Sequence, residues 1–168
     1  MKDEIITIKT PEAIAKIKEG GKILGLILQE LATMVKPGIT TADLELKAEE
    51  LIRQYGAKPA FKGYRGGGGP AYPTILCTSI NNEVVHAPAL PARKLEEGSI
   101  ISLDIGIEYP AKNGFFTDTA TTVPVGKISK EVTKLLEVTK KSLYLGIKQV
   151  KPGHRISDIG RVIEKYVS

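Results

Sequence analysis

The stretch Val35-Lys-Pro-Gly-Ile-Thr-Thr-Ala-Asp-Leu44 is followed, 115 residues later, by Val150-Lys-Pro-Gly-His-Arg-Ile-Ser-Asp-Ile159. The two stretches share the Val-Lys-Pro-Gly string, and at equal spacing an aspartate and an aliphatic residue. Self-similarity at a fixed offset is typical of a chain built from related units. A chance match of a four-residue string is the alternative. Because both stretches join two helical patterns, the sequence predicts two related helix pairs.

The first helix pair is predicted over residues 11–56. Thr10 can cap its first helix, and Pro11 suits the first turn because a proline there loses no helical hydrogen bond. Apolar or small residues then recur every three or four positions, which indicates one buried face. They are Ile14, Ile17, Gly21, Leu24, Leu28, Leu31 and Val35. Thr40 and Asp43 resemble a capping box for the second helix, whose apolar face is Leu44, Ala48, Leu51 and Ile52.

The second helix pair is predicted over residues 129–168. Ser129 and Ser157 are the expected caps of its two helices. One face of the first of these helices is expected to contain residues that again recur every three or four positions: Leu135, Val138, Ser142, Leu145 and Gln149. His154 follows the repeated Pro-Gly turn and is therefore expected in a loop.

Residues 59–125, between the two helix pairs, have the pattern of a sheet. Residues 72–87 are predicted to form a strand, a turn at Asn81-Asn82 and a second strand that ends at His86. Apolar and polar residues alternate over 101–109, and after a turn at 110–114 the chain returns through 115–123. We therefore expect a single α+β domain with an antiparallel sheet flanked by helix pairs. Because no strands follow the second pair, we expect a truncated chain in which the second half of the sheet is missing.

Two aspartates lie on the hairpin formed by residues 102–122. Asp104 is on the face opposite the aliphatic stripe of its strand, and Asp118 shares a face with Phe116 and Ala120. If Glu108 pairs with Gly114, the two aspartates stand directly opposite each other, with Cβ atoms about 4.5–5.5 Å apart. A register shifted by two residues makes them diagonal neighbours that still converge.

Two like charges this close destabilise a sheet unless a cation lies between them. Neither strand supplies a Lys or Arg on this face. A divalent metal is one interpretation, since pairs of metals bridged by carboxylates recur in hydrolytic enzymes. The alternatives are that one aspartate faces solvent at the sheet edge, or that the two share a proton.

Other chemically reactive side chains give weaker signals. Cys77 precedes His86 by nine residues, and no Ser/His/Asp or Cys/His arrangement is indicated, so Cys77 is interpreted as a buried thiol. The glycine-rich stretch 63–70 lacks the Lys-Ser/Thr of a phosphate-binding loop. It is interpreted as a flexible loop.

The composition is that of an ordinary globular protein, with 42% hydrophobic and 26% charged residues among 168. A single cysteine excludes an internal disulfide, and together with the lack of a signal-peptide pattern in residues 1–7 it favours the cytoplasm. No apolar run reaches the roughly 18 residues that a membrane span needs. The net charge of +5 is interpreted as spread along the chain. A solvated basic surface is the preferred reading and work near ribosomes the alternative.

Four segments together resemble the type I methionine aminopeptidases, in order and spacing, along nearly the whole chain. They are Lys58-Pro-Ala-Phe-Lys-Gly-Tyr64, Cys77-Thr-Ser-Ile-Asn-Asn-Glu-Val-Val-His86, Glu97-Gly-Ser-Ile-Ile-Ser-Leu-Asp104 and Phe116-Thr-Asp118. The resemblance implies the pita-bread fold of creatinases and aminopeptidases. In that fold two pseudo-symmetric halves each contribute a helix pair and part of an antiparallel sheet, which agrees with the repeat.

The resemblance also implies roles for individual residues. Asp104 and Asp118 would be two of the five ligands of a centre with two divalent metal ions, of Co, Mn, Fe or Zn. His86 would be the catalytic histidine that hydrogen-bonds the scissile amide. The pocket for a methionine side chain would be lined by Tyr64, Tyr72 and Cys77.

The chain departs from the pattern of this family in three ways. The two aspartates are 14 residues apart, which is wider than usual, and the loop between Tyr64 and Tyr72 is longer. Because an insertion in a turn leaves the strands able to pair, both aspartates are kept as ligands. The remaining ligands, one His and two Glu, do not occur before Ser168. We therefore expect the isolated chain to be inactive.

The implied activity is removal of the initiator methionine from nascent polypeptides. Its partners would be the N-termini of nascent peptides and the ribosome, with no membrane and no specific nucleic acid. We expect the intact enzyme to be a monomer and this chain alone to self-associate. A proline-directed peptidase or creatinase relative is one alternative function, and a non-catalytic pita-bread binding protein is another.

Overall fold

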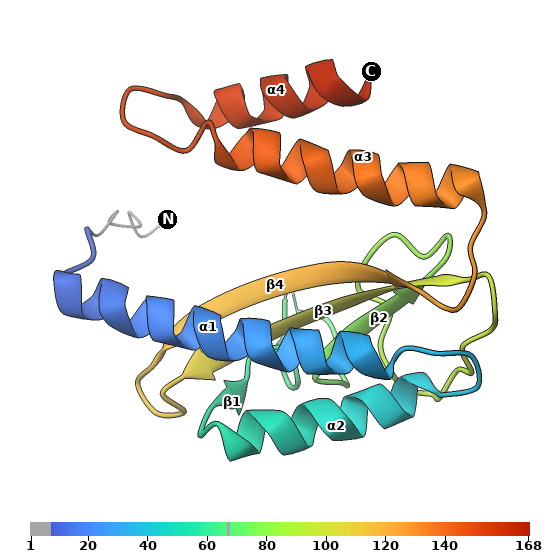
Figure 1. Cartoon of the computed structure of the whole chain (residues 1–168). Helices are drawn as coiled ribbons and strands as arrows, with labels where there is room; N and C mark the ends of the chain where they lie inside the picture. The colour runs from blue at the N-terminus through green and yellow to red at the C-terminus, as the bar shows by residue number, and fades with distance from the viewer. Residues whose placement is uncertain (1–7, 67) are drawn as a thin grey trace. The chain divides into compact units, whose positions relative to one another are not determined.

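The computed structural model describes residues 8–66 and 68–168, which divide into two compact units (Figure 1). The first unit extends to Gly126, and the second comprises Lys127–Ser168. The sequence-based interpretations of residues 1–7 and of Gly67 lie outside the described residues.

The first unit begins with the helices α1 (Pro11–Met34) and α2 (Thr41–Gln54). Both predicted caps are confirmed: the Thr10 side chain accepts a hydrogen bond from the Ala13 N–H, and Thr40 forms a capping box with Asp43. The predicted face of α1 was wrong at Ile14, which is exposed, and at Gly21, because the buried glycine is Gly20. A Cβ atom on Gly20 would lie 3.3 Å from the Cβ of Tyr109, so α1 approaches the sheet closely there.

Four antiparallel strands form the sheet: β1 (Lys58–Pro59), β2 (Leu76–Ile80), β3 (Ile100–Tyr109) and β4 (Phe115–Pro124). Strand β3 pairs with β1 and β2 along one edge and with β4 along the other. The predicted turn at 110–114 is confirmed. Gly114 is required in it, because a Cβ atom there would overlap the carbonyl oxygen of Pro110.

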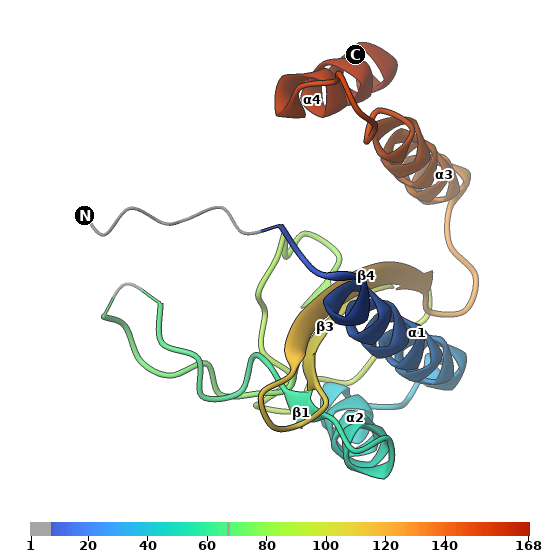
Figure 2. The same cartoon turned by 90° about the vertical axis from the view of Figure 1, so that its left-hand side faces the viewer.

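One face of the sheet is packed against α1 and α2, as both views of the chain show (Figures 1 and 2). The aliphatic stripe of β3 supplies the centre of this core, and each of its side chains is fully buried: Ile101, Leu103, Ile105 and Ile107. Burial of one such side chain stabilises the fold by about 1.5–3 kcal/mol. At the rim, the Tyr109 hydroxyl donates to Glu19 of α1 at 3.0 Å. The opposite, polar face of the sheet remains available for a site.

The predicted second strand ending at His86 is wrong. After β2 the chain turns at Asn81 and continues as a loop, in which Asn81 and His86 have φ angles of 54° and 61°. A strand does not accommodate these left-handed conformations. The carboxylate of Glu83 accepts a hydrogen bond from the Ile80 N–H at 2.7 Å and so satisfies locally a backbone group near the turn.

The second unit consists of α3 (Lys130–Ile147) and α4 (Ile156–Val167). Ser129 caps α3 as predicted, and His154 lies in the connecting turn as predicted. The prediction that Ser157 caps α4 was wrong, because α4 begins at Ile156 with Arg155 at its N-cap, and Asp158 accepts from the N–H of Arg155. The two helices approach closely at Gly146, whose added Cβ would lie 3.0 Å from Ile163.

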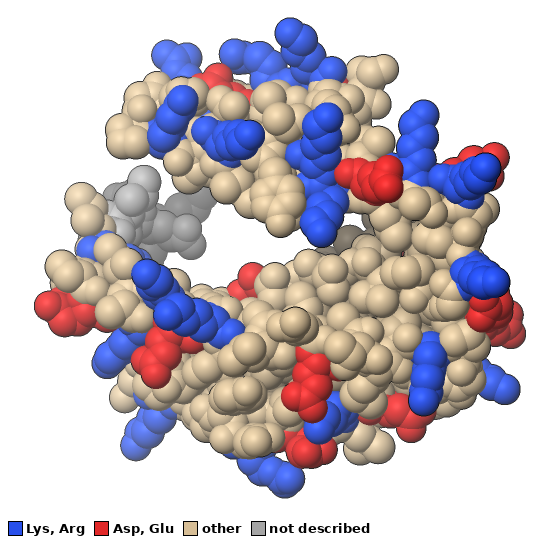
Figure 3. All heavy atoms as spheres, in the orientation of Figure 1, with Lys and Arg blue, Asp and Glu red and all other residues tan. Residues whose placement is uncertain are grey.

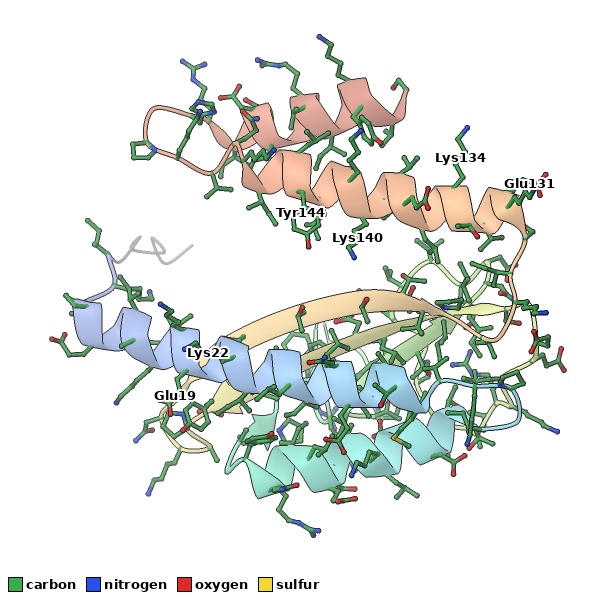
Figure 4. All side chains as sticks on the ribbon, in the orientation of Figure 1. Glu19, Lys22, Glu131, Lys134, Lys140 and Tyr144 are labelled. Carbon is green, nitrogen blue, oxygen red and sulfur yellow. The ribbon has the colours of Figure 1, made fainter. Side chains whose placement is uncertain are left out.

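The basic charge is concentrated in the second unit, so the interpretation that it is spread along the chain was wrong. Residues 127–168 contain ten Lys and Arg and four Asp and Glu, a net charge of +6, which leaves −1 for residues 1–126. Lys and Arg side chains crowd this helix pair in Figure 3, and Lys134 and Lys140 project from α3 in Figure 4. Within the described residues, none of the helices is both long and apolar enough to span a membrane.

Candidate active site

Asp104 and Asp118 lie on the polar face of the β3–β4 hairpin. Asp104 pairs across the ladder with Ala120, and Asp118 pairs with Gly106. The predicted direct opposition of the two aspartates was therefore wrong, and the diagonal arrangement that was also considered is the one observed. The physical reason is the register of the turn: Glu108 pairs with Phe116 instead of Gly114, whose N–H donates to the Glu108 carboxylate at 3.1 Å.

The two carboxylates are close enough to influence each other. Burial raises the pKa of Asp104, and the charge of Asp118 raises it further, whereas a hydrogen bond from Cys77 and the charge of His86 lower it. Burial also raises the pKa of Asp118. Neither β3 nor β4 contains a Lys or Arg, and no ion pair to either aspartate forms within residues 8–66 and 68–168. Among the described residues, no lysine or arginine therefore forms an ion pair with this acidic pair.

A pocket of about 430 Å³ opens beside the two aspartates. All six site residues predicted from the sequence line it, together with one aromatic residue that was not singled out. The lining consists of Phe61, Tyr64, Tyr72, Cys77, His86, Asp104 and Asp118. Segments far apart in the sequence thus meet at one place, although the roles of these residues stay predictions.

One wall of the pocket is aromatic and uncharged. The Tyr72 ring meets the Phe61 ring edge-on at 6.4 Å, and its hydroxyl donates to the Cys77 sulfur at 3.1 Å. Burial raises the pKa of Cys77 to about 11 and also raises the pKa of Tyr72, so both groups are neutral at pH 7. Cys77 stands directly opposite Asp104 in the β2–β3 ladder, which joins this wall to the acidic pair.

The glycine-rich stretch brings two tyrosines of the pocket together. The N–H of Gly63 donates to the carbonyl of Tyr72, and the N–H of Tyr72 donates to the carbonyl of Tyr64, both at 2.8 Å. Tyr64 remains 66% exposed at the rim. The longer loop between the two tyrosines therefore closes on itself and leaves both in the pocket.

Phe61 is the pocket residue that the sequence reasoning missed, although it lies in a segment quoted for the family resemblance. It follows β1 by two residues, and its ring packs over Gly106 on β3. A Cβ atom on Gly106 would lie 2.7 Å from the Phe61 ring. A glycine within an otherwise alternating strand signals such a close approach.

His86 reaches the pocket from the loop after β2, where it is exposed and held at a positive φ. Its charge is near enough to lower the pKa of Asp104. His86 is therefore available to a ligand in the pocket without being enclosed by the protein. His154, by contrast, lies in the turn between α3 and α4.

Comparison with known proteins identifies the family. Residues 15–168 match the model of Metallopeptidase family M24. The chain belongs to this family. Methionine aminopeptidase 1 of Bacillus subtilis is 44% identical over 164 residues, and methionine aminopeptidase of Aquifex aeolicus is 40% identical over 166 residues. These alignments cover 97% and 96% of the chain but 62% and 63% of the relatives, so this M24 chain spans less than two thirds of their length.

Solved structures confirm the predicted pita-bread fold. The methionine aminopeptidase of Thermotoga maritima superposes with a TM-score of 0.87 at 37% identity, over 97% of this chain and 62% of that one. The Xaa-Pro dipeptidase of Bacillus anthracis superposes with a TM-score of 0.77 over 95% of this chain and 41% of that one. At 18% identity, the second likeness concerns the fold alone.

The metallopeptidase family implies a divalent metal cofactor, and the two aspartates fit it as donors. Carboxylate oxygens are ligands that divalent cations accept, and a cation would relieve the mutual repulsion that raises the pKa of Asp104. The fit is partial. Within the part of the chain that the structure describes, no group of three or more His, Cys, Asp or Glu side chains converges to hold a metal.

Proposed function

We propose that this M24 chain is part of a methionine aminopeptidase, a metal-dependent hydrolase that removes the N-terminal methionine from polypeptides. The observation that carries the proposal is the pocket in which an uncharged aromatic wall adjoins two aspartates and a histidine. The identity of 37–44% to several methionine aminopeptidases supports it.

The pocket suits a methionine side chain for physical reasons. Methionine is long, unbranched and polarisable, and its sulfur interacts favourably with the edges of aromatic rings. Phe61 and Tyr72 offer two such rings at right angles, and the neutral thiol of Cys77 adds a polarisable surface. A lysine or arginine side chain would find negatively charged partners in this lining at the two aspartates, where we propose that metal binds.

Asp104 and Asp118 would hold two divalent ions together with ligands from outside the described residues. When bound, such metals supply Lewis acidity for the hydrolysis of a peptide bond. The contribution of this chain is then one of placement. The uncharged wall would receive the methionine side chain, and Asp104 beside it would fix the position of the reacting end. Whether the ions are Co, Mn, Fe or Zn is open to measurement.

His86 would donate a hydrogen bond to the scissile amide. An exposed imidazole beside the pocket can rotate toward a bound peptide, and the peptide itself would remove water from this hydrogen bond. A charge-assisted hydrogen bond of this kind contributes about 2–3 kcal/mol to transition-state stabilisation, which is roughly 10²-fold in rate.

Two other functions fit the fold less well. A proline-directed peptidase is disfavoured because the Xaa-Pro enzymes among the solved structures are 16–20% identical to this chain. A non-catalytic binding protein has no need for two like charges on neighbouring strands, and both aspartates are present.

The partners proposed for the complete protein are nascent peptide N-termini and the ribosome. The net charge of +6 on residues 127–168 supports an encounter with an anionic particle, because such charge steers association over distances near the Debye length. A cytoplasmic location follows from the proposed substrate. We also propose that the complete protein is a monomer, whereas β4, an edge strand, would let the isolated chain self-associate.

A chimera tests the proposal. This chain replaces the matching 62% of the Bacillus subtilis methionine aminopeptidase, whose own remaining residues supply the other ligands. We expect cleavage of a Met-Ala-Ser peptide in the presence of Co²⁺ or Mn²⁺, and no cleavage of Ala-Pro dipeptides. Asp118→Asn in the chimera should abolish the activity.

A second measurement tests the proposal without the chimera, in case the chimera does not fold. Methioninol is titrated into the 168-residue chain while amide signals of the pocket are followed by NMR, with lysinol as the matched control ligand. We expect methioninol to move signals at Tyr72 and Cys77, and lysinol to leave them unchanged. Equal effects of the two ligands, or an active chimera that prefers Xaa-Pro substrates, would contradict the proposal.

A further inference from the structure

The loop that carries His86 is not held by a β-ladder. It leaves β2 at Ile80 and returns to the sheet through an isolated bridge between Cys77 and Pro88, beside which the N–H of Ala87 donates to the Ser79 hydroxyl at 3.4 Å. One backbone hydrogen bond closes its base, from the N–H of Thr78 to the carbonyl of Ala87 at 2.7 Å. His86 is exposed within it and holds a positive φ, which is unfavourable for a residue with a side chain. Other contacts must therefore keep this loop in one conformation.

The guanidinium of Arg93 makes those contacts. Its Nη2 donates to the carbonyl oxygen of Thr78 at 2.7 Å, to the Thr78 hydroxyl at 2.9 Å and to the carbonyl oxygen of Pro88 at 2.9 Å. Its Nη1 donates to the carboxylate of Glu83, with 2.7 Å to Oε1. One side chain thus binds both stems of the loop and its turn, and His86 lies between the bound positions.

Glu83 connects Arg93 to the turn that follows β2. Its carboxylate also accepts the hydrogen bond from the N–H of Ile80, so it joins Arg93 to the end of β2. The hydrogen bond from Ile80 and the nearby Arg93 charge hold the pKa of Glu83 below its ordinary value. The side chains of Arg93 and Glu83 are 28% and 40% exposed, so the pair is partly screened from solvent.

The backbone of Arg93 is fixed to the core. Its N–H donates to the hydroxyl of Thr41 at 3.0 Å, and its carbonyl accepts the N–H of Thr41 at 2.9 Å. Thr41 is fully buried at the start of α2, and its hydroxyl also donates to the carbonyl of Ala89 at 2.6 Å. The restraint therefore runs from a buried helix start, through Arg93, to the loop of His86.

We propose that Arg93 is a positioning residue that holds the His86 loop in the conformation in which His86 faces the pocket. Arg93 does not line the pocket and acts through the loop. The importance of this for catalysis rests on the proposed function, whereas the restraint of the loop does not. A planar guanidinium is needed because a single ammonium cannot reach four acceptors spread around the loop.

The test uses the 168-residue chain and its two histidines. Because His86 and His154 are the only histidines, the Cε1–H region of the imidazole carbon–proton spectrum contains two signals, and His154 serves as an internal control. Arg93→Met should move or broaden the His86 signal and leave that of His154 unchanged. It should also speed hydrogen exchange of the Thr78 amide by roughly 10-fold, without changing exchange at Leu28 in α1.

Three further variants complete the design. Lys94→Met removes an exposed positive charge from the neighbouring residue and should have no effect. Arg93→Lys keeps the charge and should restore the His86 signal only in part. Glu83→Gln leaves the contacts of Arg93 to Thr78 and Pro88 in place and should therefore give a smaller change of the same kind. It provides the test if Arg93→Met does not fold.

The outcomes separate this proposal from the proposed function. If Arg93→Met and Glu83→Gln both leave the His86 signal and the Thr78 exchange rate as in the wild type, Arg93 does not position the loop. Equal changes at Leu28 would also overturn the proposal, since they would mean a general loss of stability. Neither readout depends on activity, so a failure of the aminopeptidase proposal would leave these results interpretable.

Discussion

Asp118 lies diagonally across the β3–β4 ladder from Asp104, because it pairs with Gly106. The residue directly opposite Asp118 therefore has no side chain. The Phe61 ring occupies the space that a side chain at Gly106 would fill. A single position of β3 thus lets the aromatic wall of the pocket and the acidic pair approach each other.

The acidic pair should make the metal-free chain less stable at neutral pH. The folded-state pKa of Asp104 is raised, so stability is fully present below the ordinary value of 3.8 and is lost as pH rises through the folded-state pKa. Asp104→Asn should therefore be more stable than the wild type at pH 7 and equal to it near pH 3. Because the site is partly solvated, we expect the free energy of unfolding of Asp104→Asn at pH 7 to exceed that of the wild type by less than about 1 kcal/mol.

Urea unfolding at the two pH values measures this difference. Asp43→Asn is the matched control, because the bonds of the Asp43 carboxylate to Thr40 lower its pKa. Its substitution should have the opposite effect, a loss of stability at pH 7 that disappears in acid. If Asp104→Asn is the less stable protein at pH 7, the two carboxylates do not repel each other.

Divalent metal should bind weakly to the isolated chain, and this binding should depend on both aspartates. Two carboxylates without a third ligand form an incomplete site, so we expect a Kd for Mn²⁺ of roughly 0.1–1 mM. Calorimetric titration of the wild type, Asp104→Asn and Asp118→Asn measures it. Clear binding that is indistinguishable among the three proteins would contradict the assignment of these ligands.

Local signals in the sequence predicted the helices and the central hairpin well. Thr10, Thr40 and Ser129 cap helices where expected, because an N-cap depends on residues within a single turn. The alternation in β3 predicted its buried stripe for the same reason. At Ser157 two neighbouring polar residues competed, and the carboxylate of Asp158 bound the helix start instead.

Features set by distant contacts were not predictable in this way. The register of β3 with β4 depends on how a turn with inserted residues closes, and an error of two residues turned a direct pair into a diagonal one. The loop of His86 depends on Arg93, which the sequence does not connect to Thr78 or Glu83. Asp104 and Asp118 were singled out from their shared face of the hairpin, whereas the roles of the other four site residues came from the family resemblance. Phe61 was missed because an aromatic residue after a strand is ordinarily part of a core.

Gly106→Ala should disturb the pocket more than the fold. The added methyl group would lie 2.7 Å from the Phe61 ring and 3.2 Å from the Cβ of Ala60, so the ring must move. Overpacking of this kind costs about 1–3 kcal/mol. We expect a loss of stability in that range, measured by urea unfolding, and weaker binding of methioninol.

Gly21→Ala is the control for this substitution. It lies in α1, and its added methyl group meets nothing within 4 Å. Replacing a helical glycine by alanine should stabilise the chain by about 0.5–1 kcal/mol and leave ligand binding unchanged. Equal stabilities of Gly106→Ala and the wild type would mean that Phe61 does not pack against β3.

Cys77 should react slowly with iodoacetamide at neutral pH. Burial raises the pKa of its thiol to about 11, and the thiolate is the reactive form. At pH 8 the thiolate fraction is then about 10⁻³, and the side chain is only 4% exposed. Alkylation followed by mass spectrometry should be at least about 100-fold slower than for free cysteine. A rate close to that of free cysteine would show that the pocket wall is open to solvent.

His86→Ala should separate catalysis from metal binding in the chimera with the Bacillus subtilis enzyme. The side chain lines the same pocket as Asp104 and is exposed, so we expect it to meet a substrate rather than to complete the acidic pair. Loss of one charge-assisted hydrogen bond in the transition state should lower kcat by roughly 10²-fold. The metal content, measured by mass spectrometry of the folded protein, should equal that of the parent chimera. His154→Ala, in the turn of the other unit, should change neither quantity. A His86→Ala protein that loses metal in proportion to its activity would make His86 a ligand, and its proposed contact with the scissile amide would be wrong.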